Sequence, residues 1–225
     1  MYAGSRQVAQ PHPGRALWVR WVVAMTFGEL LGFAIPAMVG VLAAVIGLTD
    51  QARYLPLVIA GAGEGAVLAL AQWWAFHRFI PELERRDWVI ATALAAAFAW
   101  SLALLPSSVS GLMEVALPVR IVGGVVLALA FVTSIGGAQW FVLRQHVARA
   151  GWWVLANAIA WPVGVAVPVV ALSLLPDDAS ALLMSSAGLV GGLLMGTVVG
   201  ALTGGVLVWL LSDRLAARSR GAFSA

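Results

Sequence analysis

Cysteine and lysine are absent from this sequence of 225 residues. Without cysteine the chain has no disulfide, no thiolate metal site and no cysteine nucleophile. Charged residues make up only 10% of the chain and hydrophobic residues 62%, whereas soluble domains are ~25% charged. So few charges cannot cover a surface that faces water, which excludes a soluble enzyme. The sequence therefore predicts a polytopic membrane protein whose main partner is the lipid bilayer.

Several familiar motifs are also missing. The chain has no P-loop, no Gly-x-Ser-x-Gly and no His-Glu-x-x-His. A formal charge of +3 would suggest nucleic acid for a soluble protein, but the positive-inside rule explains it in a membrane protein, so we expect no nucleic-acid partner. His77 and His146 give only a weak indication of a haem or metal site, and no cofactor can be named.

Six segments are long and apolar enough to be transmembrane helices, since about 20 apolar residues cross the ~30 Å hydrocarbon layer. They are 17–48, 55–79, 88–105, 115–143, 152–175 and 179–211. The predicted fold class is an all-α integral membrane bundle of six transmembrane helices. We expect three parts: an N-terminal tail (1–16), the six-helix domain (17–211) and a C-terminal tail (212–225).

Arginine and tryptophan are unevenly distributed between the two ends of these segments. Eleven of the thirteen arginines lie in the two tails, at Arg20 and around 78–86 and 144–149, and only Arg53 and Arg120 lie on the opposite side. This bias predicts that both termini face the cytoplasm. Nine tryptophans lie at the same arginine-rich ends and are typical of an aromatic belt at the membrane surface. They are Trp18, Trp21, Trp73, Trp74, Trp88, Trp140, Trp152, Trp153 and Trp209.

An internal repeat links the segments in pairs. The runs 72–78 and 139–144 both begin with Gln-Trp and end with arginine, and the segments that follow them both begin Trp-Val-x-Ala. A third copy is split, because the first segment starts with the same Trp-Val-x-Ala pattern and the last one ends with Trp209 and Arg214. The pattern predicts three pseudo-repeated hairpins (2-3, 4-5 and 6-1) about an axis normal to the membrane, with the last segment beside the first.

Small residues recur every four positions in the first and last segments. Glycines run from Gly188 to Gly204, and small residues run from Ala24 to Gly40. Such ridges let helix backbones approach closely in lipid. We expect the two ridges to pack on each other. The alternative is that the glycines form a homodimer face.

Two carboxylates, Glu29 and Glu64, lie inside the apolar segments. Glu29 is eight residues from Trp21, and Glu64 is eight residues from Gln72. Eight residues of helix span about 12 Å at ~1.5 Å per residue, so both acids lie at the same depth above the arginine-rich ends. An ionisable group at mid-membrane costs ~2.5–3.5 kcal/mol on insertion scales and normally marks a site. No basic residue lies at that depth, and two neighbouring carboxyls can share a proton, so we expect a proton or a cationic solute to bind. The alternative is structural, with a protonated glutamate donating to a carbonyl freed near Pro36 or in the glycine-rich stretch 61–65.

A second polar layer recurs with the repeat and contains Gln72, Gln139 and Asn157. Interhelical hydrogen bonding is the main expectation for these side chains, and a substrate-lining role is the alternative. Trp161, which takes the repeat position of Glu29, and Trp100 are the two tryptophans away from the arginine-rich ends. Each is a candidate cavity residue, although core packing is the commoner role for a buried indole. Pro36 is a candidate hinge because it interrupts the hydrogen bonds of its helix.

These motifs, together with Thr-Phe-Gly-Glu-Leu-Leu-Gly-Phe at 26–33, resemble a group of bacterial six-helix membrane proteins of uncharacterised function. Repeated Gln-Trp…Arg and Trp-Val-x-Ala hairpins carry the resemblance, which covers nearly the whole chain. It implies a multi-pass protein of the bacterial cytoplasmic (inner) membrane and carries no activity.

Three functions fit these features. We expect a small non-enzymatic carrier or channel-like protein that handles a proton or a cationic solute at Glu29 and Glu64. One alternative is a non-catalytic membrane subunit or a lipid- or pigment-binding module, acting as a homo-oligomer or with a partner protein. Another is an intramembrane enzyme that uses the carboxyls as acid and base, although a nucleophile or metal set is lacking.

Overall fold

The computed structural model describes residues 14–109, 111–176 and 178–222. In these ranges the chain forms six long helices and one short 3-10 turn. The helices are α1 (Arg15–Val45), α2 (Asp50–Phe76), α3 (Arg85–Ser108), α4 (Leu117–Leu143), α5 (Gly151–Ser173) and α6 (Ala181–Ala222), and the turn η1 (Leu112–Glu114) precedes α4. All six helices are long and apolar enough to cross a membrane. The predicted all-α class with six such helices is confirmed.

The helices differ from the predicted segments at their ends. α1 begins at Arg15, and α6 continues to Ala222, through most of the range that we assigned to a C-terminal tail. Residues 1–13 of the predicted N-terminal tail lie outside the described residues, as do 223–225. Long uninterrupted helices suit an apolar chain, because a helix satisfies its own backbone hydrogen bonds where lipid offers none.

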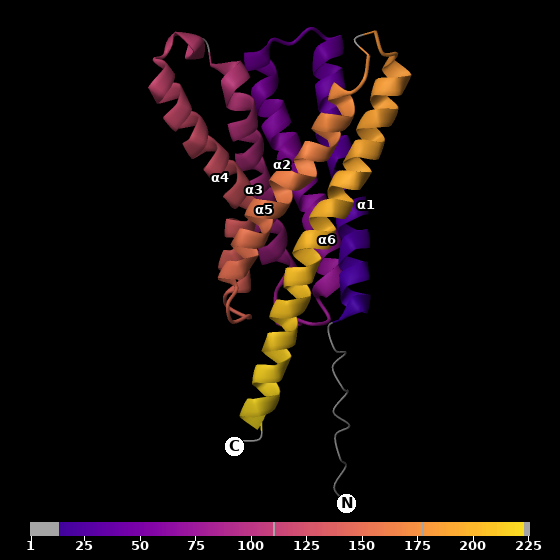
Figure 1. The fold of residues 1–225 in the computed structure, drawn as a ribbon, viewed down its shortest axis with the longest axis vertical. Coiled ribbons are helices and arrows are strands. Elements are labelled where there is room, and N and C mark those ends of the chain that lie inside the picture. Colours follow the sequence, from indigo (N-terminus) through magenta and orange to yellow (C-terminus); the bar gives the residue numbers. More distant parts are fainter. Residues whose placement is uncertain (1–13, 110, 177, 223–225) are drawn as a thin grey trace, which may run out of the picture.

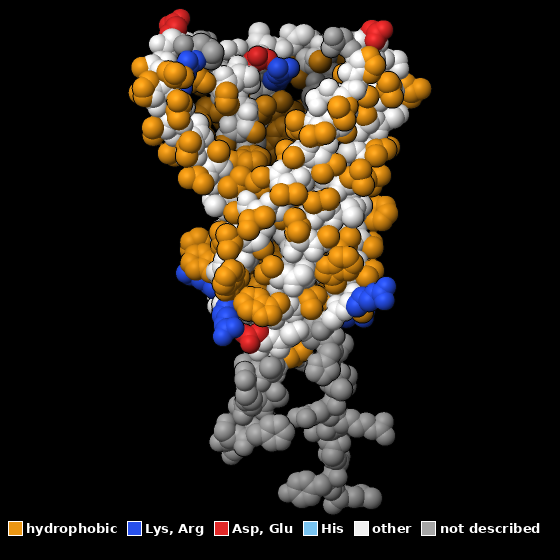
Figure 2. All heavy atoms as spheres, in the orientation of Figure 1, with side chains coloured by type: hydrophobic (Ala, Val, Ile, Leu, Met, Phe, Trp, Pro, Cys, Tyr) orange, Lys and Arg blue, Asp and Glu red, His pale blue; other side chains and the backbone are white. Residues whose placement is uncertain are grey.

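The six helices form a ring. Each helix packs against its neighbours in sequence, and α6 also packs against α1 (Figure 1). We call the end that holds the start of α1, the end of α6 and the α2–α3 and α4–α5 connections the arginine-rich end, and the opposite end the distal end. The helices converge at the arginine-rich end and spread apart toward the distal end (Figure 1). Charged side chains gather near the two ends, with a wide hydrophobic surface between them (Figure 2).

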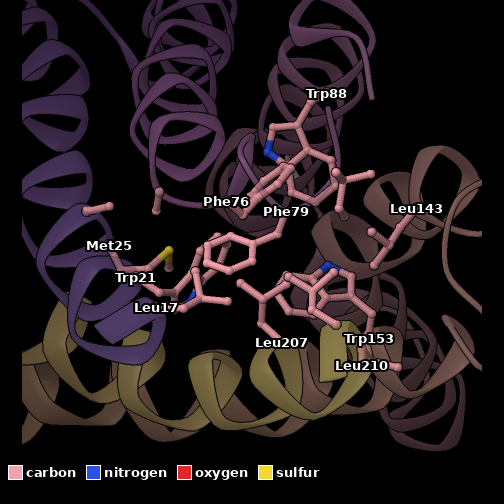
Figure 3. Packing of buried hydrophobic residues seen from close by; sticks show 14 of the residues in the cluster. Leu17, Trp21, Met25, Phe76, Phe79, Trp88, Leu143, Trp153, Leu207 and Leu210 are labelled. Atoms are coloured by element: carbon pink, nitrogen blue, oxygen red, sulfur yellow. The ribbon is translucent and has the colours of Figure 1, made fainter. Parts of the chain in front are cut away.

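The densest packing lies at the arginine-rich end. Three indoles, those of Trp21, Trp88 and Trp153, meet in the middle of the bundle (Figure 3). The ring centroids of Trp21 and Trp153 are 5.6 Å apart in an edge-to-face arrangement, and those of Trp88 and Trp153 are 6.5 Å apart. Phe76 contacts both Trp21 and Trp88. This tryptophan cluster fills the space where the helices converge.

The aromatic-belt interpretation is therefore wrong for three of its nine tryptophans. Trp21, Trp88 and Trp153 are each at most 1% exposed, so none of them lies on the outer surface. Trp74 and Trp152, by contrast, are about half exposed. An indole with its N–H satisfied is accepted equally well in a packed core and at a membrane surface, so residue type and helix position alone did not separate the two groups.

α4 is buried along only part of its length. Its buried residues are Gly136, Gln139 and Leu143, all in the last third of the helix. Its first half carries apolar side chains that are more than half exposed, such as those of Leu117, Val122 and Leu129. The ring is therefore closely packed near the arginine-rich end and loose around the distal half of α4.

The predicted contact between the first and last helices is present. A Cβ atom on Gly196, Gly200 or Gly204 would meet atoms of α1 at 2.8–3.1 Å, so only glycine allows this approach. Trp21 Nε1 donates to Thr203 Oγ1 at 2.9 Å across the same seam. Since small residues let helices approach closely in an apolar medium, these glycines hold α6 against α1.

The predicted pairing of two small-residue ridges is wrong in detail. A Cβ on Gly188 or Gly192 would meet no atom within 4 Å, and the small residues Gly28 and Gly32 of α1 face α2 instead of α6. The reason is geometric. At ~100° per residue, positions four apart drift by about 40° at each step, so the row of glycines turns around α6 and leaves the α1 seam after three members.

Candidate functional site

Glu29 on α1 and Glu64 on α2 come together inside the bundle. Glu29 is 2% exposed and Glu64 is 9% exposed. Their helices lie unusually close, because a Cβ on Gly32 would be only 2.9 Å from the backbone oxygen of Glu64. The Glu64 side chain is close to α1 as well, because the same Cβ on Gly32 would lie 3.2 Å from Glu64 Cγ, and both acids line one cavity. The structure therefore brings the two acids to one site.

Trp100 of α3 fixes the position of the Glu64 carboxyl. Its Nε1 donates to Glu64 Oε2 at 2.7 Å. The glycines beside Glu64 make this approach possible, because a Cβ on Gly61 would overlap the Trp100 indole and one on Gly65 would collide with Ala96. The glycine-rich run of α2 thus lets α3 lie against the carboxylate. Sequence reasoning did not identify Trp100 as this donor, although the combination of small residues and a mid-helix indole was visible.

Glu29 lacks a comparable donor. Within the described residues, Glu29 Oε2 is buried and has no hydrogen-bond partner. Two neighbouring carboxyls repel each other when both are ionised, and an unsatisfied buried carboxylate oxygen is costly. Glu29 and Glu64, which we call the carboxyl pair, are therefore arranged to hold either a shared proton or an added cation.

A cavity of about 400 Å³ adjoins the carboxyl pair, and all six helices contribute to its walls. Among the residues that line it, Glu29 and Glu64 are the two that ionise. The remaining walls are apolar or aromatic apart from two indole N–H groups. They comprise Phe33, Gly65, Leu68, Ala96, Ala99, Trp100, Ala103, Phe131, Ile135, Trp161, Val165, Pro168, Val169, Leu172, Gly188, Gly192 and Met195.

The cavity lies on the distal side of the tryptophan cluster. Figure 2 shows the molecule hollowed between α4 and α5 in its distal half, where α4 loses its packing. Residues of α4 and α5 such as Phe131, Ile135 and Val165 line the cavity. On the other side, Leu68 of α2 lines the cavity while Gln72, one helical turn further on, does not. The cavity therefore ends just before the polar layer.

That polar layer is a closed hydrogen-bond network. Gln72 Oε1 accepts from Trp88 Nε1 at 3.0 Å and from Gln139 Nε2 at 2.8 Å. Gln139 Nε2 also donates to Thr92 Oγ1 at 2.9 Å, and Gln139 Oε1 accepts from Trp153 Nε1 at 2.9 Å. These side chains form interhelical hydrogen bonds, which was the main expectation for Gln72 and Gln139. Neither lines the cavity, so nothing favours the substrate-lining alternative for them.

The other candidate residues divide between the cavity and its surroundings. Trp161 lines the cavity, and its Nε1 donates to Asn157 Oδ1 at 3.2 Å. Asn157 is buried and donates to Trp153 O, so both of these hydrogen bonds lie within α5 and the expected interhelical bond is not found for Asn157. Pro36 is buried inside α1, which runs without a break from Arg15 to Val45. A hinge at Pro36 stays a prediction.

The described residues contain no group of three or more His, Cys, Asp or Glu side chains that could hold a metal ion. His77 stacks on Trp73 with ring centroids 4.4 Å apart, and its Nδ1 lies 3.2 Å from Trp73 O. These contacts hold His77 at the end of α2 and give the metal or haem interpretation no second ligand.

Comparisons with known proteins leave the cavity and the carboxyl pair as the basis for a functional proposal. No family model, curated protein or solved structure matches the chain. The resemblance to bacterial six-helix membrane proteins accordingly stays a prediction.

Proposed function

We propose that the chain is a membrane carrier that binds a proton or a cationic solute at Glu29 and Glu64. One observation carries the proposal: the two carboxyl groups meet beside a cavity whose other walls hold no ionisable side chain. In lipid such groups are expensive, and they ordinarily mark an ion or substrate pathway. Without a positive neighbour the pair attracts a cation and repels an anion.

A carrier fits the shape of the molecule better than an open channel. The cavity is accessible from the distal half, while Trp21, Trp88 and Trp153 fill the bundle beyond it. An open channel needs a continuous water-filled path. Access from one side, with a packed layer on the other, is the arrangement expected of a carrier that exposes its site alternately.

We further propose that both termini are cytoplasmic and that the protein resides in the bacterial inner membrane. The support is the distribution of arginine, eleven residues against two, between the ends of the spans. In this orientation the cavity lies in the half of the membrane away from the cytoplasm.

The three-hairpin repeat is also part of the proposal, and the hydrogen bonds of the network support it. In each odd-numbered helix the tryptophan of the Trp-Val-x-Ala pattern donates to a polar side chain of the even-numbered helix in its hairpin: Trp88 to Gln72, Trp153 to Gln139 and Trp21 to Thr203. Each glutamine also donates to the preceding hairpin, to Met25 Sδ or to Thr92 Oγ1. The carboxyl pair breaks this repetition, since it occupies one junction only.

The test measures the proton movement that an added cation drives across the membrane of proteoliposomes containing the purified protein. We expect Glu29→Gln and Glu64→Gln each to abolish protein-dependent movement, because either change removes half of the carboxyl pair. Glu114→Gln is the matched control, since Glu114 lies exposed in the turn η1. Wild-type rates in both cavity variants would contradict the carrier proposal.

A non-catalytic lipid-binding or partner-binding module is the second candidate, and the exposed distal half of α4 favours it. A lipid, a pigment or a protein that stays bound through purification would support this function. For catalysis we find less support, because the cavity walls offer no hydroxyl or imidazole group beside the carboxyl pair. We therefore propose a binding role without enzyme activity.

A further inference from the structure

We propose that the cavity binds a lipophilic cation, meaning an apolar molecule with one positive charge such as a protonated hydrophobic amine, and that this ligand enters from the bilayer between α4 and α5. The proposal rests on the proposed cation site at the carboxyl pair and names its substrate class and its route. Its basis is the combination of apolar walls, buried acid and a lateral opening.

The walls select the body of the ligand. A volume of about 400 Å³ is within the ~300–1,000 Å³ of small-molecule sites. A bare Ca²⁺ or Mg²⁺ ion requires about six oxygen ligands, whereas two carboxyls are the only acidic groups on these walls. A hydrated ion gains nothing from walls such as Leu68, Val165 and Met195. An apolar molecule gains by burying its surface there.

The charge of the ligand is selected by three features. The carboxyl pair supplies negative charge, and Glu29 Oε2 is free to accept a hydrogen bond or face a cation. Aromatic faces attract cations as well, and the cavity is lined by Phe33, Trp100 and Trp161. Trp100 donates a hydrogen bond to Glu64, so Glu29 is the carboxyl with the less satisfied oxygen.

The route is indicated by α4. Its distal half is apolar and exposed at Leu117, Val122 and Leu129, and the space beside it leads into the hollow seen in Figure 2. Lipid chains cover this region when the helices span a bilayer. A lipophilic cation concentrates in that layer, so it reaches the carboxyl pair without crossing the polar network.

The test compares two ions of the same shape and opposite charge, tetraphenylphosphonium and tetraphenylborate. Binding of each radiolabelled ion is measured by equilibrium dialysis against the protein in phosphatidylcholine nanodiscs, with empty nanodiscs as background. We expect saturable binding of the phosphonium to wild type and none of the borate. In the doubly substituted Glu29→Gln, Glu64→Gln protein, phosphonium affinity should fall about tenfold or more because the attracting charge is gone.

A second pair of variants tests the cavity itself. Gly192 lines the cavity, and a Cβ there meets no atom within 4 Å. Gly192→Leu should therefore fill the cavity and abolish phosphonium binding while the melting temperature stays at or above the wild-type value. Gly205→Leu is the matched control on α6, since a Cβ there also meets nothing within 4 Å and Gly205 is not among the lining residues. It should bind like wild type.

The outcomes separate this inference from the proposed carrier. Absence of phosphonium binding, equal binding of both ions, or full binding by Gly192→Leu would overturn the lipophilic-cation inference. If carboxyl-dependent proton movement persisted in that case, the carrier proposal would stand. Charge-selective binding that depends on the carboxyl pair, without any proton movement, would instead support the ligand class and overturn the carrier.

Discussion

At the residue scale, the site depends on a glycine whose missing side chain leaves room for an indole. Trp100 reaches Glu64 because Gly61 has no side chain to obstruct the ring. In a mostly apolar protein this hydrogen bond fixes one carboxyl while its partner Glu29 stays unsatisfied at Oε2. The two acids are thus neighbours with different surroundings, and the difference originates in α3.

Gly61→Ala is expected to destabilise the protein by ~1–3 kcal/mol, because overpacking forces a neighbour to move and the indole is that neighbour. Gly63→Ala is the matched control, since its Cβ would make only ordinary contacts with Ile35 at 3.4 and 3.5 Å. It should be neutral or up to ~1 kcal/mol more stable, as alanine favours helix. Thermal unfolding in detergent measures both variants, and equal melting temperatures would show that Trp100 is not held as described.

The sequence identified the carboxyl pair but only half of its surroundings. A carboxylate in an apolar segment is visible because its cost in lipid is high. Trp161 was found through the repeat, whereas Gln72 and Gln139 were assigned to the right network and do not reach the cavity. Apolar wall residues such as Ile135 and Val165 gave no signal, since they resemble every other residue of their helices.

At the scale of helices, number and class followed from hydropathy, because only a helix of sufficient length satisfies its backbone in lipid. Hydropathy was a poorer guide to which face of each helix is buried. In a soluble protein an apolar stripe marks the buried face, but here the outward face is apolar too. The exposed distal half of α4 and the buried tryptophans Trp21, Trp88 and Trp153 were therefore not distinguishable by composition.

The α1–α6 seam provides a test at this scale. Gly200→Val should lower stability by ~1–3 kcal/mol, because its Cβ would lie 2.8 Å from Met25 Cβ and separate the helices. Gly205→Val on the same helix meets nothing within 4 Å and should leave stability close to wild type. Unfolding in detergent with a denaturant series compares the two. A Gly200→Val protein as stable as the control would contradict the close seam.

At the scale of the whole molecule, one end of the bundle is closely packed and the other is loosely packed. The arginine-rich end holds the tryptophan cluster and the polar network, and Arg214 there donates to Phe79 O and to Glu82 Oε2, both at 2.6 Å. The distal end is spread (Figure 1) and contains the cavity. A rearrangement that exposes the carboxyl pair on the other side of the membrane would have to separate the packed helices at the arginine-rich end.

The proposed orientation predicts the behaviour of reporter fusions. Green fluorescent protein joined after Ala225 should fluoresce, and alkaline phosphatase joined there should be inactive, because the arginine bias places that end in the cytoplasm. Insertion of each reporter after Gly111, in the distal α3–α4 connection, should give the opposite pair of results. Active phosphatase at the C-terminus would contradict the orientation and with it the half of the membrane in which the cavity lies.

Closure of the ring by its first and last helices also determines the order of assembly. The Cβ of Glu29 packs beside Gly196 of α6, and about 170 residues separate the two. At ~5–20 residues per second of synthesis, α1 waits roughly ten to thirty seconds for this neighbour. Once α2 has been made, Glu29 has its α2 neighbour, but its α6 side stays uncovered until α6 follows. A ribosome that stopped after α5 would release an open ring, so the site is complete only after α6 has been made.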